Sequence, residues 1–308
     1  MNTLTSISNA SSIANQWKLL HTLQGHIDGI TAVSVADNGY TAVSGSWDAM
    51  VNVWNIISGQ LELTFSDNSS GVLSIATFPD GQKAVSVGRD KVLKIWDLTS
   101  GQLLRTLIGH NDWVQAVSVE LNGKTAISGG WDNNVKYWNL DTGQAIKTLY
   151  GHKDAVRGVA ISLDGTLGLS ASADNIIILW NLVNGDIIRT FTEHAGAVTS
   201  VAFAPDGKTF ISGSWDETIK LWDITSDKAI YTLTGHVDTV RAVAISHDGF
   251  TAISGGWDKT VRLWDLARGQ LITVLEGHEK EVNTVAFTPN DTMALSGSRD
   301  CTVKVWKR

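Results

Sequence analysis

The chain has 308 residues, of which 43% are hydrophobic and 18% charged, values that are ordinary for a soluble folded protein. Its formal net charge of −7 at pH 7 argues against general binding to nucleic acid or to an anionic membrane, since both need a basic surface. The single cysteine, Cys301, excludes an intrachain disulfide, and no apolar run reaches the ~18 residues of a membrane-spanning helix.

The first segment of the chain, residues 1–15, is polar and has neither a basic region nor an apolar run. Such a segment lacks the features of a secretory signal and the apolar residues that a packed core needs. We therefore expect a disordered polar lead over residues 1–15, a single folded domain over residues 16–308 and a cytoplasmic location.

From about residue 16 onward the sequence repeats with a period of 42 residues. A tryptophan recurs at Trp54, Trp96, Trp138, Trp180, Trp222, Trp264 and Trp306. An aspartate recurs at Asp48, Asp90, Asp132, Asp174, Asp216, Asp258 and Asp300, and a serine at Ser44, Ser86, Ser128, Ser170, Ser212, Ser254 and Ser296. A histidine recurs at His26, His110, His152, His194, His236 and His278, with Asn68 in the second copy. Seven copies without insertion or deletion indicate a repeat architecture.

Each copy predicts four short strands, as the sixth copy illustrates. TVRAVAIS (239–246) is apolar and β-branched and ends at the turn HDG; FTAISGG then runs to the turn at Trp257 and Asp258. TVRLWDL alternates in character, and the turn ARG leads into QLITVLEGH. The first turn is Asn-Gly or Asp-Gly in six copies, and both pairs tolerate the positive φ of a tight turn. The seventh copy departs from this pattern with Asn290-Asp291.

The recurring Gly-His pair, Ser-Gly-x-x-Asp turn and Trp-Asp ending resemble the WD40 repeat family, and the regular array is similar to its prokaryotic members. The Trp-Asp ending of the repeat is not strict, because Asn follows Trp54, Trp138 and Trp180, and Lys follows Trp306. The resemblance implies an all-β, seven-bladed propeller with four antiparallel strands per blade. The last copy stops after its third strand, whereas QWKLLHTLQGH (16–26) looks like a fourth strand. We therefore expect the N-terminal strand to close the last blade, which removes open sheet edges.

The resemblance also implies that His, Ser, Asp and Trp of each copy form a hydrogen-bonded structural tetrad, for example His26, Ser44, Asp48 and Trp54. The same residue types occur in hydrolase triads, but a hydrolase needs one set that converges on its substrate. Six equivalent sets at a fixed step favour the structural role, in which Asp and Ser satisfy both nitrogens of a buried imidazole. The second copy has Asn68 in place of histidine, so we expect its sheet to be the least rigid.

Candidate binding residues stand just before each turn aspartate, where the sequence varies while the frame stays constant. This position reads Trp47, Arg89, Trp131, Ala173, Trp215, Trp257 and Arg299. The resemblance places it at the rim of the central channel, on the top face, and Trp113 in a neighbouring loop extends the set. Tryptophan and arginine dominate binding hot spots. In the alternative interpretation, each tryptophan simply packs on the loop of the adjacent blade.

A second series stands two residues before the core tryptophan and reads Lys94, Lys136, Lys220, Arg262 and Lys304. We expect these side chains to form a solvated sheet face, because alternate residues of a strand share one face. His21 and His247 lie outside the tetrads and are too far apart in the repeat to suggest a metal site. Nucleotide-binding glycine motifs are also missing.

These features favour a non-catalytic scaffold that binds a protein or peptide on its top face, without cofactor or metal and as a monomer. The alternative is a sensor or regulatory WD40 module of a larger signalling ATPase or kinase system. A third interpretation, an enzyme with its active site in the channel, is disfavoured because the copies carry no inserted loops or convergent acid–base pairs.

Overall fold

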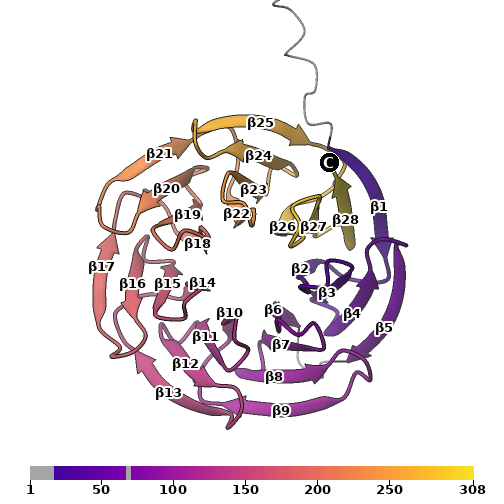
Figure 1. Ribbon diagram of the computed structural model, residues 1–308, viewed down its shortest axis with the longest axis horizontal. Coiled ribbons are helices and arrows are strands. Elements are labelled where there is room, and N and C mark those ends of the chain that lie inside the picture. The colour runs from indigo at the N-terminus through magenta and orange to yellow at the C-terminus, as the bar shows by residue number, and fades with distance from the viewer. Residues whose placement is uncertain (1–16, 67–70) are drawn as a thin grey trace, which may run out of the picture.

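The structure is a computed structural model that describes residues 17–66 and 71–308. In these residues twenty-eight strands form seven four-stranded antiparallel sheets, which surround a central axis like the blades of a propeller (Figure 1). The predicted all-β, seven-bladed fold is therefore confirmed. The expected lead at residues 1–15 lies outside the described residues. Within the described ranges, no helix is long and apolar enough to cross a membrane.

The four strands of each blade follow one another from the axis outward (Figure 1). The innermost strands are β2 (Ile30–Val35), β6 (Val72–Thr77), β10 (Val114–Val119), β14 (Val156–Ile161), β18 (Val198–Phe203), β22 (Val240–Ile245) and β26 (Val282–Phe287). The second strands are β3 (Thr41–Ser46), β7 (Lys83–Gly88), β11 (Thr125–Gly130), β15 (Leu167–Ser172), β19 (Thr209–Ser214), β23 (Thr251–Gly256) and β27 (Met293–Ser298).

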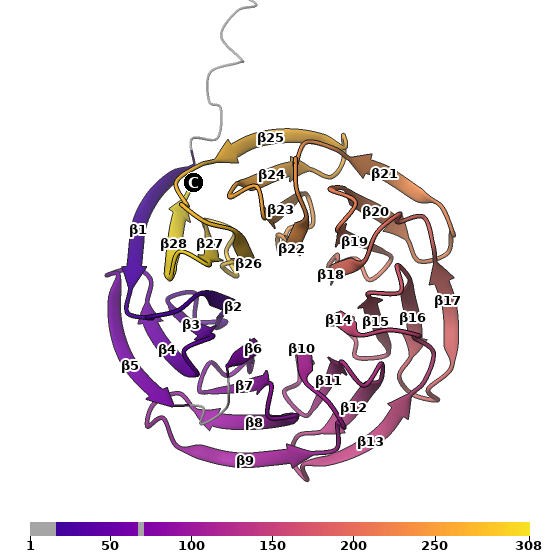
Figure 2. The ribbon, with the colours of Figure 1, turned by 180° about the vertical axis from the view of Figure 1, so that it is seen from behind.

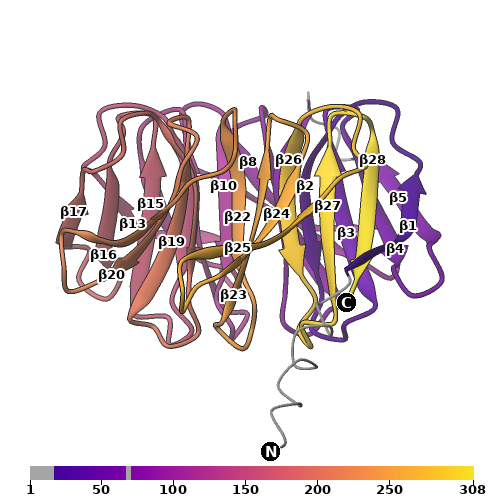
Figure 3. The ribbon, with the colours of Figure 1, turned by 90° about the horizontal axis from the view of Figure 1, so that it is seen from above.

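The third strands are β4 (Met50–Asn55), β8 (Val92–Asp97), β12 (Val135–Asn139), β16 (Ile177–Asn181), β20 (Ile219–Asp223), β24 (Val261–Asp265) and β28 (Thr302–Lys307). The outer strands are β5 (Gln60–Ser66), β9 (Leu103–Ile108), β13 (Gln144–Leu149), β17 (Ile187–Phe191), β21 (Ala229–Leu233), β25 (Gln270–Leu275) and β1 (Lys18–Gln24). Figure 3 shows these strands running between the two flat faces of the ring.

The hydrophobic core lies between neighbouring blades. Ile219 of β20 and Trp264 of β24, for example, belong to one buried cluster that joins the fifth and sixth blades. Glycine in the second strand lets the next blade approach, because a Cβ on Gly45 would lie only 2.5 Å from Cγ1 of Val72. Since each blade shares its core with both neighbours, the blades stabilise one another around the ring.

The N-terminal strand completes the last blade, as predicted. Strand β1 pairs antiparallel with β28, and the two lie side by side in both views of the ring (Figures 1 and 2). Nζ of Lys304 donates a hydrogen bond to Oγ1 of Thr22 at 3.1 Å, and Trp17 packs against Phe287 with ring centroids 6.3 Å apart. The two ends of the described fold are thereby held in one sheet.

Six of the blades contain a hydrogen-bonded His–Ser–Asp–Trp set in their interior. In the sixth blade the indole N–H of Trp264 donates to Oγ of Ser254 at 2.9 Å. The serine hydroxyl then donates to Nε2 of His236 at 2.8 Å, and Nδ1–H of His236 donates to Asp258 at 2.8 Å. This direction follows because an indole N–H can only donate and a carboxylate can only accept.

The tetrad aspartates also fix the loops of one face of the ring. Oδ2 of Asp132 accepts the backbone N–H of Asn111, and Oδ1 accepts that of Asn134. One carboxylate therefore holds both the loop before the inner strand and the turn between the second and third strands. We call the face that carries these loops and turns the top face.

The tetrad environment keeps five of the aspartates ionised. Burial raises the pKa of Asp132, but hydrogen bonds from His110 and from the Asn111 backbone outweigh it and lower the pKa to about 2. The same balance lowers the pKa values of Asp174, Asp216, Asp258 and Asp300. Burial lowers the pKa of His26 below its ordinary 6.5, against the opposing charge of Asp48.

The second blade keeps part of this network. Trp96 donates to Ser86 at 2.9 Å, and Asp90 forms an ion pair with Lys94 at 2.5 Å. Lys94 thus supplies a positive partner for the aspartate of this blade. Asn68, which occupies the histidine position, lies outside the described residues.

We predict that Asp132→Asn lowers the free energy of unfolding by about 1–3 kcal/mol near neutral pH, because it disrupts a buried network. In the unfolded chain the carboxylate of Asp132 takes up a proton as the pH falls through its ordinary pKa of 3.8. In the folded protein it stays charged until the pH falls to its lowered pKa of about 2. Its stabilisation is therefore present above about pH 4 and is lost as the pH falls toward the folded pKa. Urea denaturation at several acidic pH values should show a steeper loss for the wild type than for the variant; parallel losses would contradict this.

We also predict that amides of β7 and β8 exchange hydrogen faster than the matched amides of β23 and β24. Histidine bridges Ser and Asp through the two nitrogens on opposite sides of its ring. The shorter side-chain amide of asparagine cannot bridge the two residues in the same way. Hydrogen–deuterium exchange measures the difference, and the paired change Asp67→Gly with Asn68→His should reduce it. Equal protection of the two blades in the wild type would show that the second blade is as rigid as the sixth.

Candidate functional site

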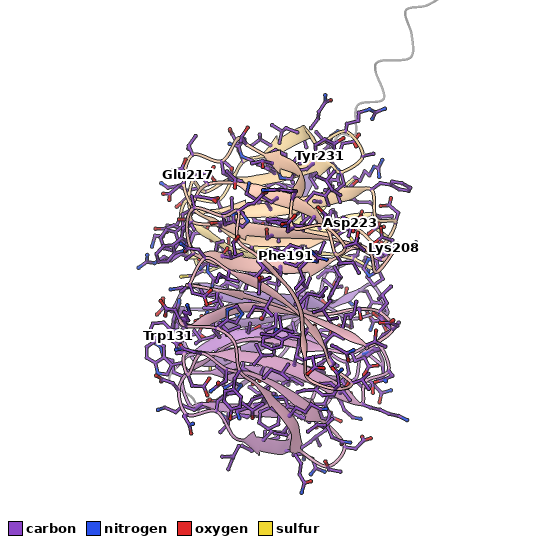
Figure 4. All side chains as sticks on the ribbon, turned by 90° about the vertical axis from the view of Figure 1, so that its left-hand side faces the viewer. Trp131, Phe191, Lys208, Glu217, Asp223 and Tyr231 are labelled. Carbon is purple, nitrogen blue, oxygen red and sulfur yellow. The ribbon has the colours of Figure 1, made fainter. Side chains whose placement is uncertain are left out.

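A channel runs along the axis of the ring. It comprises an upper chamber of about 580 Å³, a narrow middle of about 140 Å³ and a lower chamber of about 400 Å³. Arg157 and Arg241 line both the upper chamber and the middle, and Val159 lines both the middle and the lower chamber. The upper chamber opens on the top face. Figure 4 shows Trp131 on this face and Lys208 on the opposite one.

Most of the candidate binding residues surround the upper chamber. Its lining includes Trp47, Arg89, Trp113, Trp131, Trp257 and Arg299. Trp215 is not part of the lining, but its ring contacts the guanidinium of Arg157, whose central carbon lies 4.9 Å from the ring centroid. Ala173 and Trp215 are thus the two positions of the series that do not line the chamber.

The turn that carries each candidate residue has a fixed backbone. The N–H of Trp47 donates to the carbonyl of Gly29 at 3.1 Å, which joins the turn to the loop before the inner strand. Asp48 follows it, and Ala49 then takes a left-handed backbone with φ of 64°. The same conformation recurs in the other six copies, from Lys91 to Cys301. The side chains at the rim therefore project from short turns whose backbone conformation repeats from copy to copy.

On the first three blades the aromatic residues form a continuous stack. The guanidinium carbon of Arg89 lies 4.3 Å from the ring centroid of Trp47 and 4.5 Å from that of Trp113. The rings of Trp113 and Trp131 are 4.9 Å apart, and Trp131 donates its indole N–H to Oε1 of Gln115 at 3.1 Å. Cation–π contacts of this kind stabilise both partners, so the stack is ordered before anything binds.

Three indoles remain accessible to a partner. Trp131, Trp215 and Trp257 are 42%, 46% and 40% exposed, whereas Trp47 and Trp113 are half-buried. Large aromatic side chains gathered at a surface usually mark a recognition site. The candidate set therefore contains an internal stack and three exposed anchors, and Trp131 belongs to both.

A further series, which the sequence analysis missed, lines the channel below the rim. The second residue of each inner strand reads Thr31, Leu73, Gln115, Arg157, Thr199, Arg241 and Asn283. All of these line the narrow middle, and all but Thr199 also line the upper chamber. The available signal was an arginine within an otherwise apolar strand, in VRGVAI and VRAVAI.

The upper chamber is positively charged although the protein is acidic. Four arginines, Arg89, Arg157, Arg241 and Arg299, line it together with two acids, Asp28 and Glu281. Arg299 and Glu281 form an ion pair at 3.6 Å. The lining thus carries two net positive charges within a chain of net charge −7.

The lysine series does not form a solvated sheet face, so that expectation was wrong. Lys94, Lys136 and Lys304 are buried, at 8–9% exposure. Lys136 reaches across its blade to Oγ1 of Thr148 at 2.8 Å, and Lys220 does the same to Thr232 at 2.9 Å. A long alkyl chain lets the ammonium group cross the strand to a hydroxyl on the outer strand.

The tetrads lie apart from the channel. Among the residues that the structure describes, none of the tetrad side chains lines the upper chamber. In the same ranges, no group of three or more His, Cys, Asp or Glu side chains is arranged to hold a metal ion. The chamber is thus lined mainly by aromatic, guanidinium and amide groups, with the carboxylates of Asp28 and Glu281.

A comparison with protein-family models matches the family described as "WD domain, G-beta repeat" seven times. The matches cover residues 17–55, 59–97, 101–139, 143–181, 185–223, 227–265 and 269–307. A comparison with curated proteins found no match. Propellers of the matched family are generally non-catalytic scaffolds that bind protein partners. Because the matches span most of the chain, the protein belongs to the WD40 repeat family.

Proposed function

We propose that the protein is a non-catalytic scaffold that binds a protein or peptide segment in the upper chamber of its top face. The observation that carries this proposal is the convergence of an ordered Arg–Trp stack and the exposed indoles of Trp131 and Trp257 on one chamber, with the exposed indole of Trp215 against Arg157 of its lining. Tryptophan and arginine are the residues most enriched in binding hot spots.

The size of the chamber favours a short segment as the bound element. Its volume of about 580 Å³ is within the usual range of ligand sites and holds a few side chains. A loop or an extended peptide of a partner fits this space, with the rest of the partner outside the ring. The partner-binding residues are then Trp47, Arg89, Trp113, Trp131, Trp215, Trp257 and Arg299.

The rigidity of the rim supports the same proposal. The turns are held by the tetrad carboxylates, and Arg89 is fixed between two indole rings. Binding to such a surface orders few additional side chains, which reduces the entropic cost of association.

The test compares two triple variants. We predict that changing Trp131, Trp215 and Trp257 to Ala weakens peptide binding at least about tenfold, because these are the exposed aromatic anchors. Binders are first selected from a displayed library of short random peptides on the wild type, and their affinities are then measured by fluorescence anisotropy. Melting temperatures should stay close to that of the wild type, since these side chains are partly exposed.

The matched control changes Tyr40, Leu163 and Phe250 to Ala. These apolar residues are also exposed, at 48%, 54% and 67%, but they lie at the turns between the first and second strands, at the end of the ring opposite the top face. The control should bind the selected peptides as the wild type does. Failure of the wild type to select any peptide, or loss of binding in the control alone, would contradict the proposed function.

A further inference from the structure

Two arginines at the base of the upper chamber have no acidic partner. Arg157 and Arg241 are the second residues of β14 and β22 and line both the chamber and the narrow middle. Among the described residues, 17–66 and 71–308, neither guanidinium forms an ion pair or a hydrogen bond, and Nε of Arg157 is buried without a partner. Nε of Arg89 is also buried without a partner, but its guanidinium lies between the rings of Trp47 and Trp113. The fourth arginine of the chamber, Arg299, pairs with Glu281 at 3.6 Å.

The two positive charges repel each other, and both side chains are partly buried. Burial lowers the pKa of Arg241 to about 10, and the nearby charge of Arg157 contributes to this shift. Burial also lowers the pKa of Arg157, and Asp154 opposes that effect. Asp154 is exposed and its Oδ1 accepts the backbone N–H of Ala155, so it offers limited compensation. Both arginines remain protonated at neutral pH.

The groups around this pair do not neutralise it. Thr199 lies between the two arginines in the channel series. Its hydroxyl donates to the backbone carbonyls of Gly213 and Val240, so it is already engaged within the protein. Gln115 accepts the indole N–H of Trp131 through Oε1, which leaves its NH₂ group as a hydrogen-bond donor. The lining at this level therefore provides guanidinium and amide donors.

We propose that Arg157 and Arg241 form an anion-binding subsite that takes the carboxylate or phosphate group of a side chain in the bound segment. This inference rests on the proposed function and adds the chemistry of the partner. A planar guanidinium binds an oxyanion through paired N–H donors, and such charge-assisted hydrogen bonds are the strongest in proteins. The exposed indoles at the rim contact the apolar neighbours of the anionic side chain.

The first experiment uses peptide libraries of random sequence that differ only in one fixed central residue: glutamate, phosphoserine or the neutral glutamine. We expect the wild type to bind the glutamate or the phosphoserine library at least about tenfold more tightly than the glutamine library. The better of the two anionic libraries identifies the source of the oxyanion. Equal binding of all three libraries by the wild type would overturn the proposal.

Variants test whether a preference for the anionic libraries depends on Arg157 and Arg241. Arg157→Gln with Arg241→Gln should remove the preference for anionic libraries while binding of the glutamine library persists. Arg241→Gln alone, which leaves the contact between Arg157 and Trp215 in place, should reduce it. The control, Arg105→Gln with Arg268→Gln, removes two exposed charges outside the channel and should keep the preference. An unchanged preference in the double channel variant would overturn the proposal.

A second measurement tests the subsite without any peptide, so its failure is distinguishable from failure of the proposed function. Without an anion, Arg241→Gln alone, which keeps the contact between Arg157 and Trp215, should melt at or above the wild-type temperature, because the substitution removes repulsion between two like charges. Sodium phosphate should raise the melting temperature of the wild type more than sodium chloride of equal ionic strength and pH, with no such difference in the double channel variant. An Arg241→Gln variant that melts lower, or a wild type that does not distinguish the two salts, would overturn the subsite even if peptides bind.

Discussion

Closure of the ring is the constraint on which the rest of the molecule depends. The buried clusters lie between blades, so each blade needs two neighbours to cover its core. The first and last blades meet this need because Lys18–Gln24 pairs with Thr302–Lys307. Closure also leaves no open edge between blades at which another chain could add a strand. The channel and the top face exist only in the closed ring.

The tetrads connect this frame to the surface that we propose for binding. In each of six blades, one aspartate accepts hydrogen bonds from a histidine and from the backbone of the loop that precedes the inner strand. The same carboxylate holds the turn whose preceding residue stands at the rim. Rim side chains thereby vary from blade to blade while their backbone positions stay constant. The repeated tetrads hold the loops and turns in place, and the variable rim positions determine which groups a partner can contact.

Repetition made the architecture and part of the site predictable from the sequence. The constant step of 42 residues placed the strands, the closing strand and the rim series, because each copy encodes the same unit. Arg157 and Arg241 were missed, since alternation alone does not show which face of an inner strand meets the axis. Lys136 was assigned to solvent because its reach to Thr148 depends on the neighbouring strand. Asp291 replaces a turn glycine, and its carboxylate accepts backbone N–H groups of His247 and Asp248 in the preceding blade, a long-range contact.

The partner segment that we propose enters the upper chamber. The most direct measurement places a photoreactive benzoylphenylalanine at position 257, on the rim, and in a second variant at position 250, on the opposite face. Each variant is irradiated with a peptide selected on the wild type, and mass spectrometry locates the crosslinks. We predict crosslinks from position 257 and none from position 250. Crosslinks from position 250 alone would place recognition on the other face and contradict binding in the upper chamber.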